Sequence, residues 1–198
     1  MSNSRAVRVT SRPERVTRRA SKSTSTPPNE KLRGSPGSDR TCERRKDRVL
    51  SVALLTCADE RIVPEVLFDQ PPGTFYTVRI AGNLYSPEAA GSLEVAVVRH
   101  HCPLVLVLGH SGCSAVRLAH SRDRSEGALY ELTRRIRPVV DALSPGASLD
   151  EAVEANVRHT VRELRERCRG LREREERGEL QIAGAVYDLE TGAVRVLV

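Results

Sequence analysis

Runs of apolar residues alternate with amphipathic stretches along the chain from Val49 onward. Residues 49–57 and 104–108 are continuous apolar segments, typical of strands buried on both faces of a sheet. Residues 75–79 predict a shorter strand, rich in aromatic and β-branched side chains. Between it and the later strand, residues 87–101 have the apolar spacing of a helix. Strand, helix and strand in this order predict a right-handed parallel crossover.

A second helical pattern begins at Ser148, where Ser148 and Glu151 have the spacing of a capping box. It continues to Cys168 with apolar residues three and four apart, and its charged face is interpreted as a solvated surface with Glu–Arg pairs. Residues 181–187 then predict a last core strand, and 193–198 an edge strand after a turn. The expected fold class is α/β, with a mainly parallel central sheet flanked by helices and an antiparallel edge strand near the C-terminus.

Composition divides the chain of 198 residues into two parts. Residues 1–48 carry 14 Lys and Arg against 5 Asp and Glu, which leaves 18 basic and 21 acidic residues in the remainder. The first part is rich in Arg, Ser, Thr and Pro and has almost no apolar periodicity, which predicts a basic, disordered N-terminal extension. Residues 49–198 are long enough for one domain with a single core.

The basic extension allows more than one interpretation. A solvated arm is the simplest, and an organelle transit peptide or an arm that binds phosphate backbones or anionic lipid are alternatives for which the pattern is not specific. No aromatic residue is interleaved with its charges, which argues against a stacking platform for single-stranded nucleic acid. We therefore expect no nucleic-acid partner.

Cysteine usage and hydropathy bear on the cellular compartment. The chain has five cysteines, an odd number, and no apolar signal sequence, which argues against a disulfide framework and favours a reducing compartment. No apolar run approaches the length needed to span a bilayer. We expect a soluble, cytoplasmic protein without membrane association.

Two clusters of metal-binding residue types follow the buried strands. Cys57, Asp59 and Arg61 come directly after the first strand, and His110 and Cys113 come directly after the later one. Strand ends of this kind face the crevice of an open parallel sheet, where ligands and catalytic groups collect. Cys, His and Cys form a zinc set with one coordination position left open, which indicates chemistry.

The alternative for each cysteine is a small buried hydrophobe, which is our interpretation of Cys102 and Cys168. Metal binding is the better interpretation of Cys57, His110 and Cys113, because they lie at the ends of adjacent strands and His-x-x-Cys has the spacing of metal ligands. A structural zinc site would need four protein ligands, and only the carboxylate of Asp59 could supply the fourth.

The residues around these clusters resemble the β-class carbonic anhydrases. The matching segments keep the order and spacing of that family and together span most of residues 50–198: Cys57–Arg61, Val63–Glu65, Phe68–Gln70, Val78–Asn83, Gly91–Val97, Gly109–Cys113, Asn156–Val157 and Gly184–Gly192. The resemblance implies a β-carbonic-anhydrase-like fold and a zinc lyase that hydrates carbon dioxide reversibly to bicarbonate and a proton through a zinc-bound hydroxide. It also implies a homodimer or a larger homo-oligomer.

The resemblance assigns roles to further residues. It implies that Asp59 and Arg61 act as a catalytic pair that gates the metal. In a closed state Asp59 occupies the fourth position of Zn²⁺, and in an open state it pairs with Arg61 and accepts a hydrogen bond from the zinc-bound water. Gln70 matches a family position near a subunit contact, Gly82 and Asn83 match the loop near the active site, and all three are expected to line the substrate pocket. For Gly82 a backbone role in a turn is the first interpretation. In the family a histidine is the usual proton shuttle, and the candidates are His100, His101, His120 and His159. A surface or structural role is expected for each of them.

Departures from the family pattern keep two alternatives open. Glu60 stands where serine is usual, Ser114 stands where glycine is usual, and the amino-terminal helices of the family have no clear counterpart in residues 1–48. One alternative is a hydrolase of carbonyl sulfide or carbon disulfide with the same zinc site. The other is a non-catalytic zinc-binding protein whose extension recruits a partner.

Overall fold

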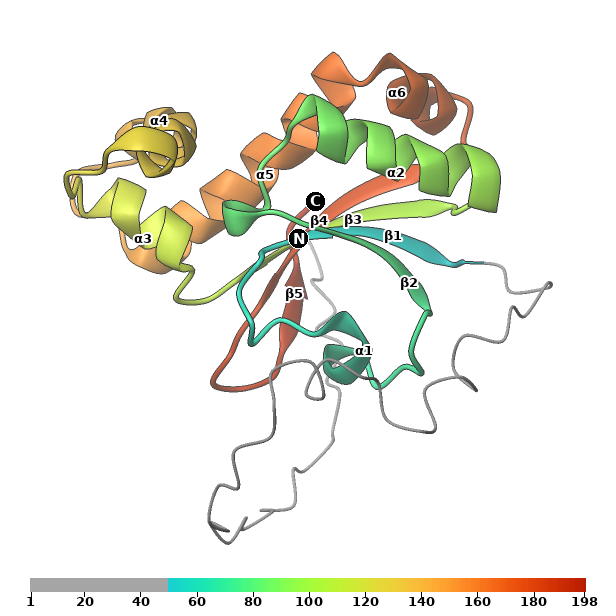
Figure 1. Cartoon of the computed structure of the whole chain (residues 1–198), viewed down its shortest axis with the longest axis horizontal. Coiled ribbons are helices and arrows are strands. Elements are labelled where there is room, and N and C mark those ends of the chain that lie inside the picture. The colour runs from blue at the N-terminus through green and yellow to red at the C-terminus, as the bar shows by residue number, and fades with distance from the viewer. Residues whose placement is uncertain (1–49) are drawn as a thin grey trace, which may run out of the picture. The chain divides into compact units, whose positions relative to one another are not determined.

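A computed structural model describes residues 50–198, and the expected extension 1–48 lies outside the described residues. The described strands form one sheet of order β2-β1-β3-β4-β5 (Figure 1). Their bounds are β1 Val52–Thr56, β2 Phe75–Arg79, β3 Leu104–His110, β4 Gln181–Tyr187 and β5 Val194–Val196. The first four pair in parallel, and β5 runs antiparallel to β4. The predicted fold class is confirmed, and β3 extends two residues beyond its predicted end to include His110.

The helices are α1 Pro64–Leu67, α2 Pro87–His100, α3 Ser114–His120, α4 Gly127–Asp141, α5 Leu149–Arg167 and α6 Arg169–Glu176, with a short 3₁₀ turn, η2, at Ala81–Asn83. Both helices predicted from apolar spacing, α2 and α5, are present. The predicted capping box at the start of α5 is also present, since the Ser148 hydroxyl accepts from the Glu151 N–H and the Glu151 carboxylate accepts from the Ser148 N–H. Helices α1, α3, α4 and α6 were not predicted.

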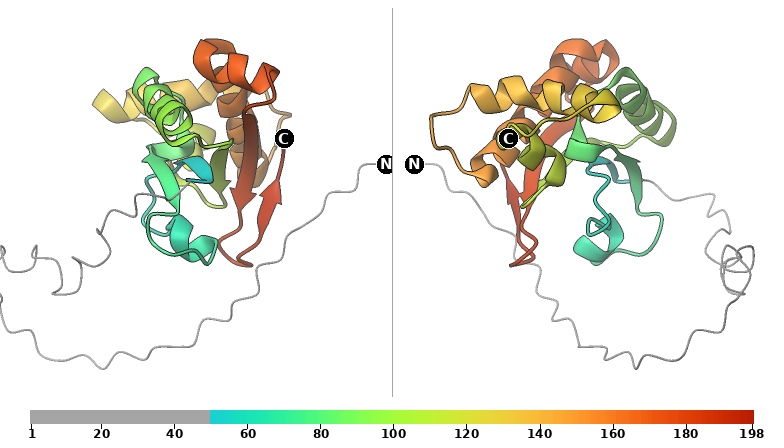
Figure 2. Two further views of the ribbon diagram at one scale, coloured as in Figure 1. Left: turned by 90° about the vertical axis from the view of Figure 1, so that its right-hand side faces the viewer. Right: turned by 60° about the vertical axis from the view of Figure 1, so that its left-hand side comes forward.

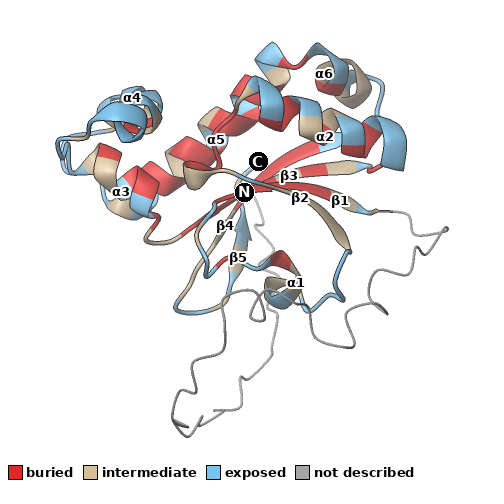
Figure 3. Ribbon diagram, in the orientation of Figure 1, coloured by how far each residue is buried: buried red, intermediate tan, exposed pale blue. Residues whose placement is uncertain are grey.

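Helices α2 and α5 cover the same face of the sheet (Figures 1 and 2). Alternate strand residues such as Leu55 and Val107 pack on that face against Leu93 of α2 and Val157 of α5. The intervening residues, among them Leu54, form a smaller cluster on the other face that is closed by the end of α1. Because both faces are covered, the strands are apolar at consecutive positions, and the buried residues concentrate where helices meet the sheet (Figure 3).

The chain reverses its direction across the sheet at β1. It leaves β1 for the edge strand β2 through α1, then crosses back over β1 to β3 through α2 on the opposite face. Right-handed crossovers in opposite directions require helices on opposite faces, as found. The carboxyl ends of β1 and β3 are therefore a topological switch point, the position at which open α/β sheets bind ligands.

Within residues 50–198 no helix has the length and apolar character required to cross a bilayer. The cysteines of this part of the chain, Cys57, Cys102, Cys113 and Cys168, are all buried and free.

Candidate metal centre

The switch point brings together the three candidate ligands. Cys57 directly follows β1, His110 is the last residue of β3, and Cys113 is the N-cap of α3. Because β1 and β3 are hydrogen-bonded neighbours, these side chains converge, and their ligand atoms all lie within 4.8 Å of one another. The two sulfur atoms are 3.9 Å apart, and all three residues are buried.

The imidazole of His110 is oriented for metal binding. Its Nδ1 lies 3.0 Å from the carbonyl oxygen of Ser111, a contact that places the ring proton on Nδ1. Its Nε2 is buried and has no hydrogen-bond partner among the residues that the structure describes. A buried polar atom without a partner is rare, and coordination of a cation would satisfy this one. Two sulfur atoms and the imidazole Nε2 form a ligand set that suits Zn²⁺. A hydrogen bond at the second ring nitrogen, here Nδ1, is typical of a zinc-bound histidine.

The two thiols influence each other's ionisation. The pKa of Cys57 is lowered, first because the Cys113 thiol donates to it, and further because His110 and the Gly82 N–H interact with it. The same contact with Cys57, together with burial, raises the pKa of Cys113. The pair therefore holds one thiolate readily and resists a second. A divalent cation at this position would stabilise both thiolates.

The carboxylate of Asp59 lies at the edge of the ligand set. Arg61 binds it with two parallel hydrogen bonds, from Nε to Oδ1 at 2.8 Å and from Nη2 to Oδ2 at 2.7 Å. These bonds hold the pKa of Asp59 well below its usual range, so the group is ionised. Its Oδ2 lies 3.8 Å from Nε2 of His110. A carboxylate in this position can turn either toward a metal ion or toward Arg61.

Arg79, which received no role from the sequence, hydrogen-bonds to the loop that carries Cys57 and Asp59. Arg79 ends β2 in register with Thr56, the last residue of β1. Its Nε donates to the Cys57 carbonyl oxygen at 3.3 Å, and its Nη2 donates to the Asp59 carbonyl oxygen at 2.5 Å. A basic residue at the carboxyl end of a strand beside a ligand-bearing strand is the signal that could have identified it.

Of the three residues predicted to line the substrate pocket, Gly82 contacts the ligand set. Gly82 lies in η2 with a positive φ of 70°, and its N–H donates to Cys57 Sγ at 3.4 Å. Asn83 follows it, buried and with a φ of 45°. Gln70 is exposed beyond α1, and its side chain donates to the Phe68 carbonyl oxygen rather than to the ligand set. A substrate-pocket role for Gln70, Gly82 and Asn83 stays a prediction.

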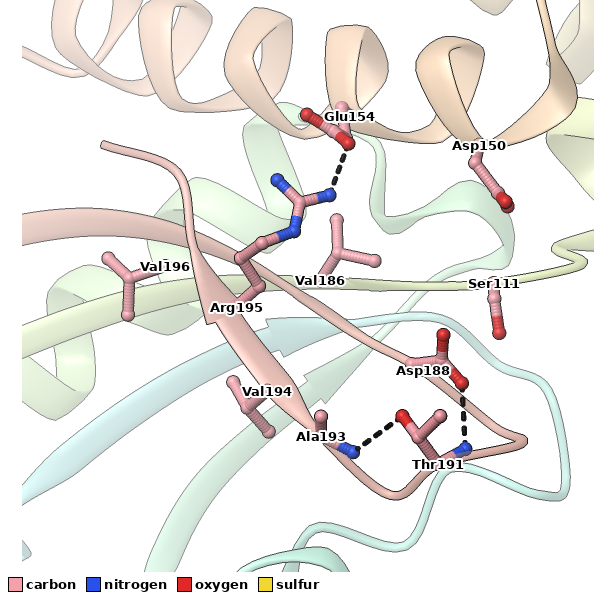
Figure 4. A pocket seen from close by; sticks show the side chains of 10 residues that line it. All are labelled: Ser111, Asp150, Glu154, Val186, Asp188, Thr191, Ala193, Val194, Arg195 and Val196. Carbon is pink, nitrogen blue, oxygen red and sulfur yellow. Dashed lines mark hydrogen bonds and ion pairs between the residues drawn. The ribbon is translucent and has the colours of Figure 1, made fainter. Parts of the chain in front are cut away.

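Two pockets adjoin the site. A cavity of about 460 Å³ is lined by Arg61, by Ser111 and Gly112 of the loop between His110 and Cys113, and by Arg117 of α3. A smaller pocket of about 250 Å³ lies between the start of α5 and the β4–β5 hairpin, where Arg195 pairs with Glu154 (Figure 4). None of the three candidate ligands lines either pocket, but the larger cavity is lined by Arg61, the partner of Asp59, and by Gly112, which directly precedes Cys113.

The four other histidines and the two departures from the family pattern lie on helices and exposed loops. His120 Nε2 lies 2.7 Å from the Ala147 carbonyl oxygen, and His159 Nε2 lies 3.3 Å from Glu163. Neither these two nor His100 and His101 line the cavity beside Arg61. Glu60 and Ser114 are both exposed, so neither side chain is buried against the ligands.

Comparison with known proteins agrees with this geometry. A family model described as carbonic anhydrase matches residues 52–194. Carbonic anhydrase 2 of Mycobacterium tuberculosis is 35% identical over 151 residues, 72% of each chain, and the carbonic anhydrase of Mycolicibacterium smegmatis is 31% identical over 171 residues, 83% of each chain.

Solved structures show the same fold. The Coccomyxa β-carbonic anhydrase, solved in complex with acetazolamide, is 26% identical with a TM-score of 0.68, covering 81% of this chain and 79% of its own. A tetrameric β-carbonic anhydrase of Sordaria macrospora is 21% identical with a TM-score of 0.69, covering 77% and 82% of the respective chains. The ordered match over residues 52–194 and the shared sheet lead to one conclusion: this chain belongs to the β-carbonic anhydrase family.

Proposed function

We propose that this protein is a zinc-dependent carbonic anhydrase, which interconverts carbon dioxide and water with bicarbonate and a proton. The observation that carries the proposal is the convergence of Cys57, His110 and Cys113, whose ligand atoms lie within 4.8 Å of one another at the switch point of the sheet. Three protein ligands leave one position of a tetrahedral zinc ion for chemistry, whereas structural zinc sites are closed by four.

Zinc held by these residues would lower the pKa of a bound water from about 15.7 to about 7 and would so supply, at neutral pH, the nucleophile that carbon dioxide needs. Asp59 has the role of hydrogen-bond acceptor that orients this nucleophile. Its carboxylate is ionised, its side chain is 9% exposed, and its Oδ2 is 3.8 Å from the ligand nitrogen of His110. An acceptor held in a fixed direction would orient the nucleophile toward carbon dioxide.

Arg61 keeps Asp59 in that role. Both nitrogens of its guanidinium fork are engaged with the Asp59 carboxylate, at 2.8 and 2.7 Å. Without this partner the Asp59 carboxylate would be free to turn toward a bound metal ion and to act as a fourth ligand, which would close the site. The pair therefore acts as the gate, and Arg79 holds the backbone of the same loop in place.

We also propose that the protein is a homo-oligomer. The relative from Sordaria macrospora is described as tetrameric. On this chain, Val63 and Val66 at α1 and Val95 and Val98 on α2 are exposed apolar side chains, and burial of such groups favours association. Sedimentation velocity of the full chain should give a species of at least two chains, and a monomer at micromolar concentration would contradict the assembly.

Stopped-flow hydration of carbon dioxide with a pH indicator tests the proposed activity. The wild type loaded with one zinc per chain should accelerate hydration, whereas Cys113→Ala should lose the metal and fall to the buffer rate. Cys102→Ala is the matched control, because it also removes a buried thiol but one outside the ligand set, and it should keep both zinc and activity. Zinc at full occupancy with hydration at the buffer rate would refute the proposal and direct the assay to carbonyl sulfide and carbon disulfide.

A further inference from the structure

We infer that Asn156 is a positioning residue of the metal centre, which acts through Gly82 on the sulfur of Cys57; this inference rests on the proposed zinc function. Asn156 lies in α5 and is fully buried. Its Nδ2 donates to the carbonyl oxygen of Gly82 at 2.8 Å, and the N–H of Gly82 donates to Cys57 Sγ at 3.4 Å. One amide thus connects a helix on the face of the sheet to a metal ligand 99 positions earlier in the sequence.

The Gly82 turn is a segment that needs external support. Gly82 and Asn83 are consecutive residues with positive φ, 70° and 45°, a conformation that costs energy for the asparagine. A methyl group on Gly82 would lie 3.1 Å from Ile136 Cδ1 and 3.3 Å from Ala115 Cβ, so the turn is enclosed by its neighbours. In such surroundings the Gly82 carbonyl cannot rely on water, and Asn156 supplies its donor.

Loss of that donor would change the position of the Gly82 N–H. A buried carbonyl without a partner carries a desolvation penalty, and the turn can reduce it only by rotating its peptide groups. Such a rotation moves the adjacent N–H away from Cys57 Sγ, which it now meets at 3.4 Å. Hydrogen bonds to a ligand set its orientation and the charge that it donates to the metal.

Asn156 is itself held rigidly. Its neighbours Val153 and Val157 pack so closely on β3 that a methyl group on Gly109 would lie 3.3 and 2.5 Å from them. Gly109 directly precedes the ligand His110. Helix α5 therefore packs against β3, which bears the ligand His110, and is hydrogen-bonded to the Gly82 turn, which contacts the ligand Cys57.

The choice of residue at position 156 supports the same conclusion. It lies on the buried face of α5 among Val153, Val157 and Val161, where an apolar side chain would suit the core. The amide leaves its Oδ1 without a hydrogen-bond partner among residues 50–198, so it is a costly choice for packing alone. Departures of this kind from a local packing rule are expected where a side chain serves a site.

Zinc affinity and the spectrum of the cobalt-substituted protein test the inference. In Asn156→Leu, which keeps a branched side chain but has no donor, we expect zinc to bind about 10-fold more weakly by competition with a chromophoric chelator. We also expect a shifted sulfur-to-cobalt charge-transfer band. Asn156→Ala, which cannot overpack the site, should give the same two changes and serves if the leucine variant does not fold.

Thr160→Val is the matched control. Thr160 lies one helical turn further along α5, is fully buried and has a hydroxyl without a partner among the described residues. Its replacement should leave affinity and spectrum unchanged. Wild-type values in both Asn156 variants, or an equal loss in Thr160→Val, would overturn the inference while zinc binding and hydration by the wild type keep the proposed function intact. A wild type that binds no zinc would remove both.

Discussion

Replacing Gly109 by alanine should destabilise the protein, because β3 and α5 approach each other too closely there for a side chain. A methyl group at this position would lie 2.5 Å from Cγ2 of Val157 and 3.3 Å from Cγ1 of Val153. Carbon atoms in proteins pack at about 3.5–4.0 Å, so the helix and the strand must separate by roughly 1 Å. The same residue precedes the ligand His110, so the strain arises beside the metal centre.

The expected magnitude combines two opposing effects. Forcing an extra methyl group into a packed core costs about 1–3 kcal/mol. Replacing glycine in a strand interior restores about 0.5–1 kcal/mol through reduced entropy of the unfolded chain. The net loss in free energy of unfolding should be about 1–2 kcal/mol, measured by urea denaturation of the zinc-saturated protein under reducing conditions.

Two further variants isolate the cause. Gly91→Ala makes the same chemical change on the exposed face of α2, where no atom lies within 4 Å of the new methyl group. It should therefore stabilise the protein by about 0.5–1 kcal/mol. Val157→Ala removes the atom that clashes, so the double variant Gly109→Ala/Val157→Ala should be about 1 kcal/mol more stable than the sum of the single changes.

The reasoning would be refuted if Gly109→Ala were as stable as the wild type, or if its effect and that of Val157→Ala simply added. Either result would mean that β3 and α5 have room for the methyl group. Opposite signs for the two glycine replacements, with a positive coupling in the double variant, would support the close approach.

Three other changes have defined outcomes. Glu175→Gln should cost about 1 kcal/mol at neutral pH, because Glu175 accepts two hydrogen bonds from Arg165 and one from the Ile182 N–H. Arg165 lowers the pKa of the Glu175 carboxyl in the folded protein. The contribution of Glu175 to the free energy of unfolding is therefore complete above the unfolded-state pKa of about 4.3 and is lost as the pH falls through the lower folded-state pKa. Urea titrations should show the stabilities of the wild type and Glu175→Gln converging below about pH 4. Ser148→Ala removes the N-cap of α5 and should lower the free energy of unfolding by about 1 kcal/mol, and an unchanged urea midpoint would contradict the capping role. Removal of zinc by a chelator should lower the melting temperature of the wild type and leave that of Cys113→Ala unchanged, as calorimetry can check.

Most of the fold follows from the sequence because its main elements bury long apolar stretches. β3 extends past its apolar run to Gly109 and His110 because these residues pair with Val186 and Tyr187 of β4, which the local pattern cannot reveal. Of the helices that were missed, α6 has only Leu171 buried, whereas α4 carries Leu132, Ile136 and Val140 at helical spacing and was predictable. A helix such as α6, which contributes a single residue to the core, leaves little periodic apolar signal.

In the candidate site, too, some contacts could be predicted from the sequence and others could not. The ligand set was predictable, since ends of adjacent parallel strands must meet, and the pairing of Asp59 with Arg61 needs a separation of only two residues. The bonds from Arg79 to the loop and from Asn156 to Gly82 join residues 20 to 74 positions apart. Such contacts depend on how the loops and α5 pack after the sheet forms, and no local spacing encodes them.

X-ray absorption at the zinc edge of the loaded protein tests the metal centre most directly. Ligation by Cys57, His110 and Cys113 requires two sulfur neighbours at about 2.3 Å, one imidazole nitrogen at about 2.0–2.1 Å and a single further oxygen or nitrogen neighbour. Cys113→Ala should lose this spectrum together with the metal. A zinc ion surrounded by four sulfurs, or by oxygen and nitrogen alone, would contradict the site described for this carbonic anhydrase.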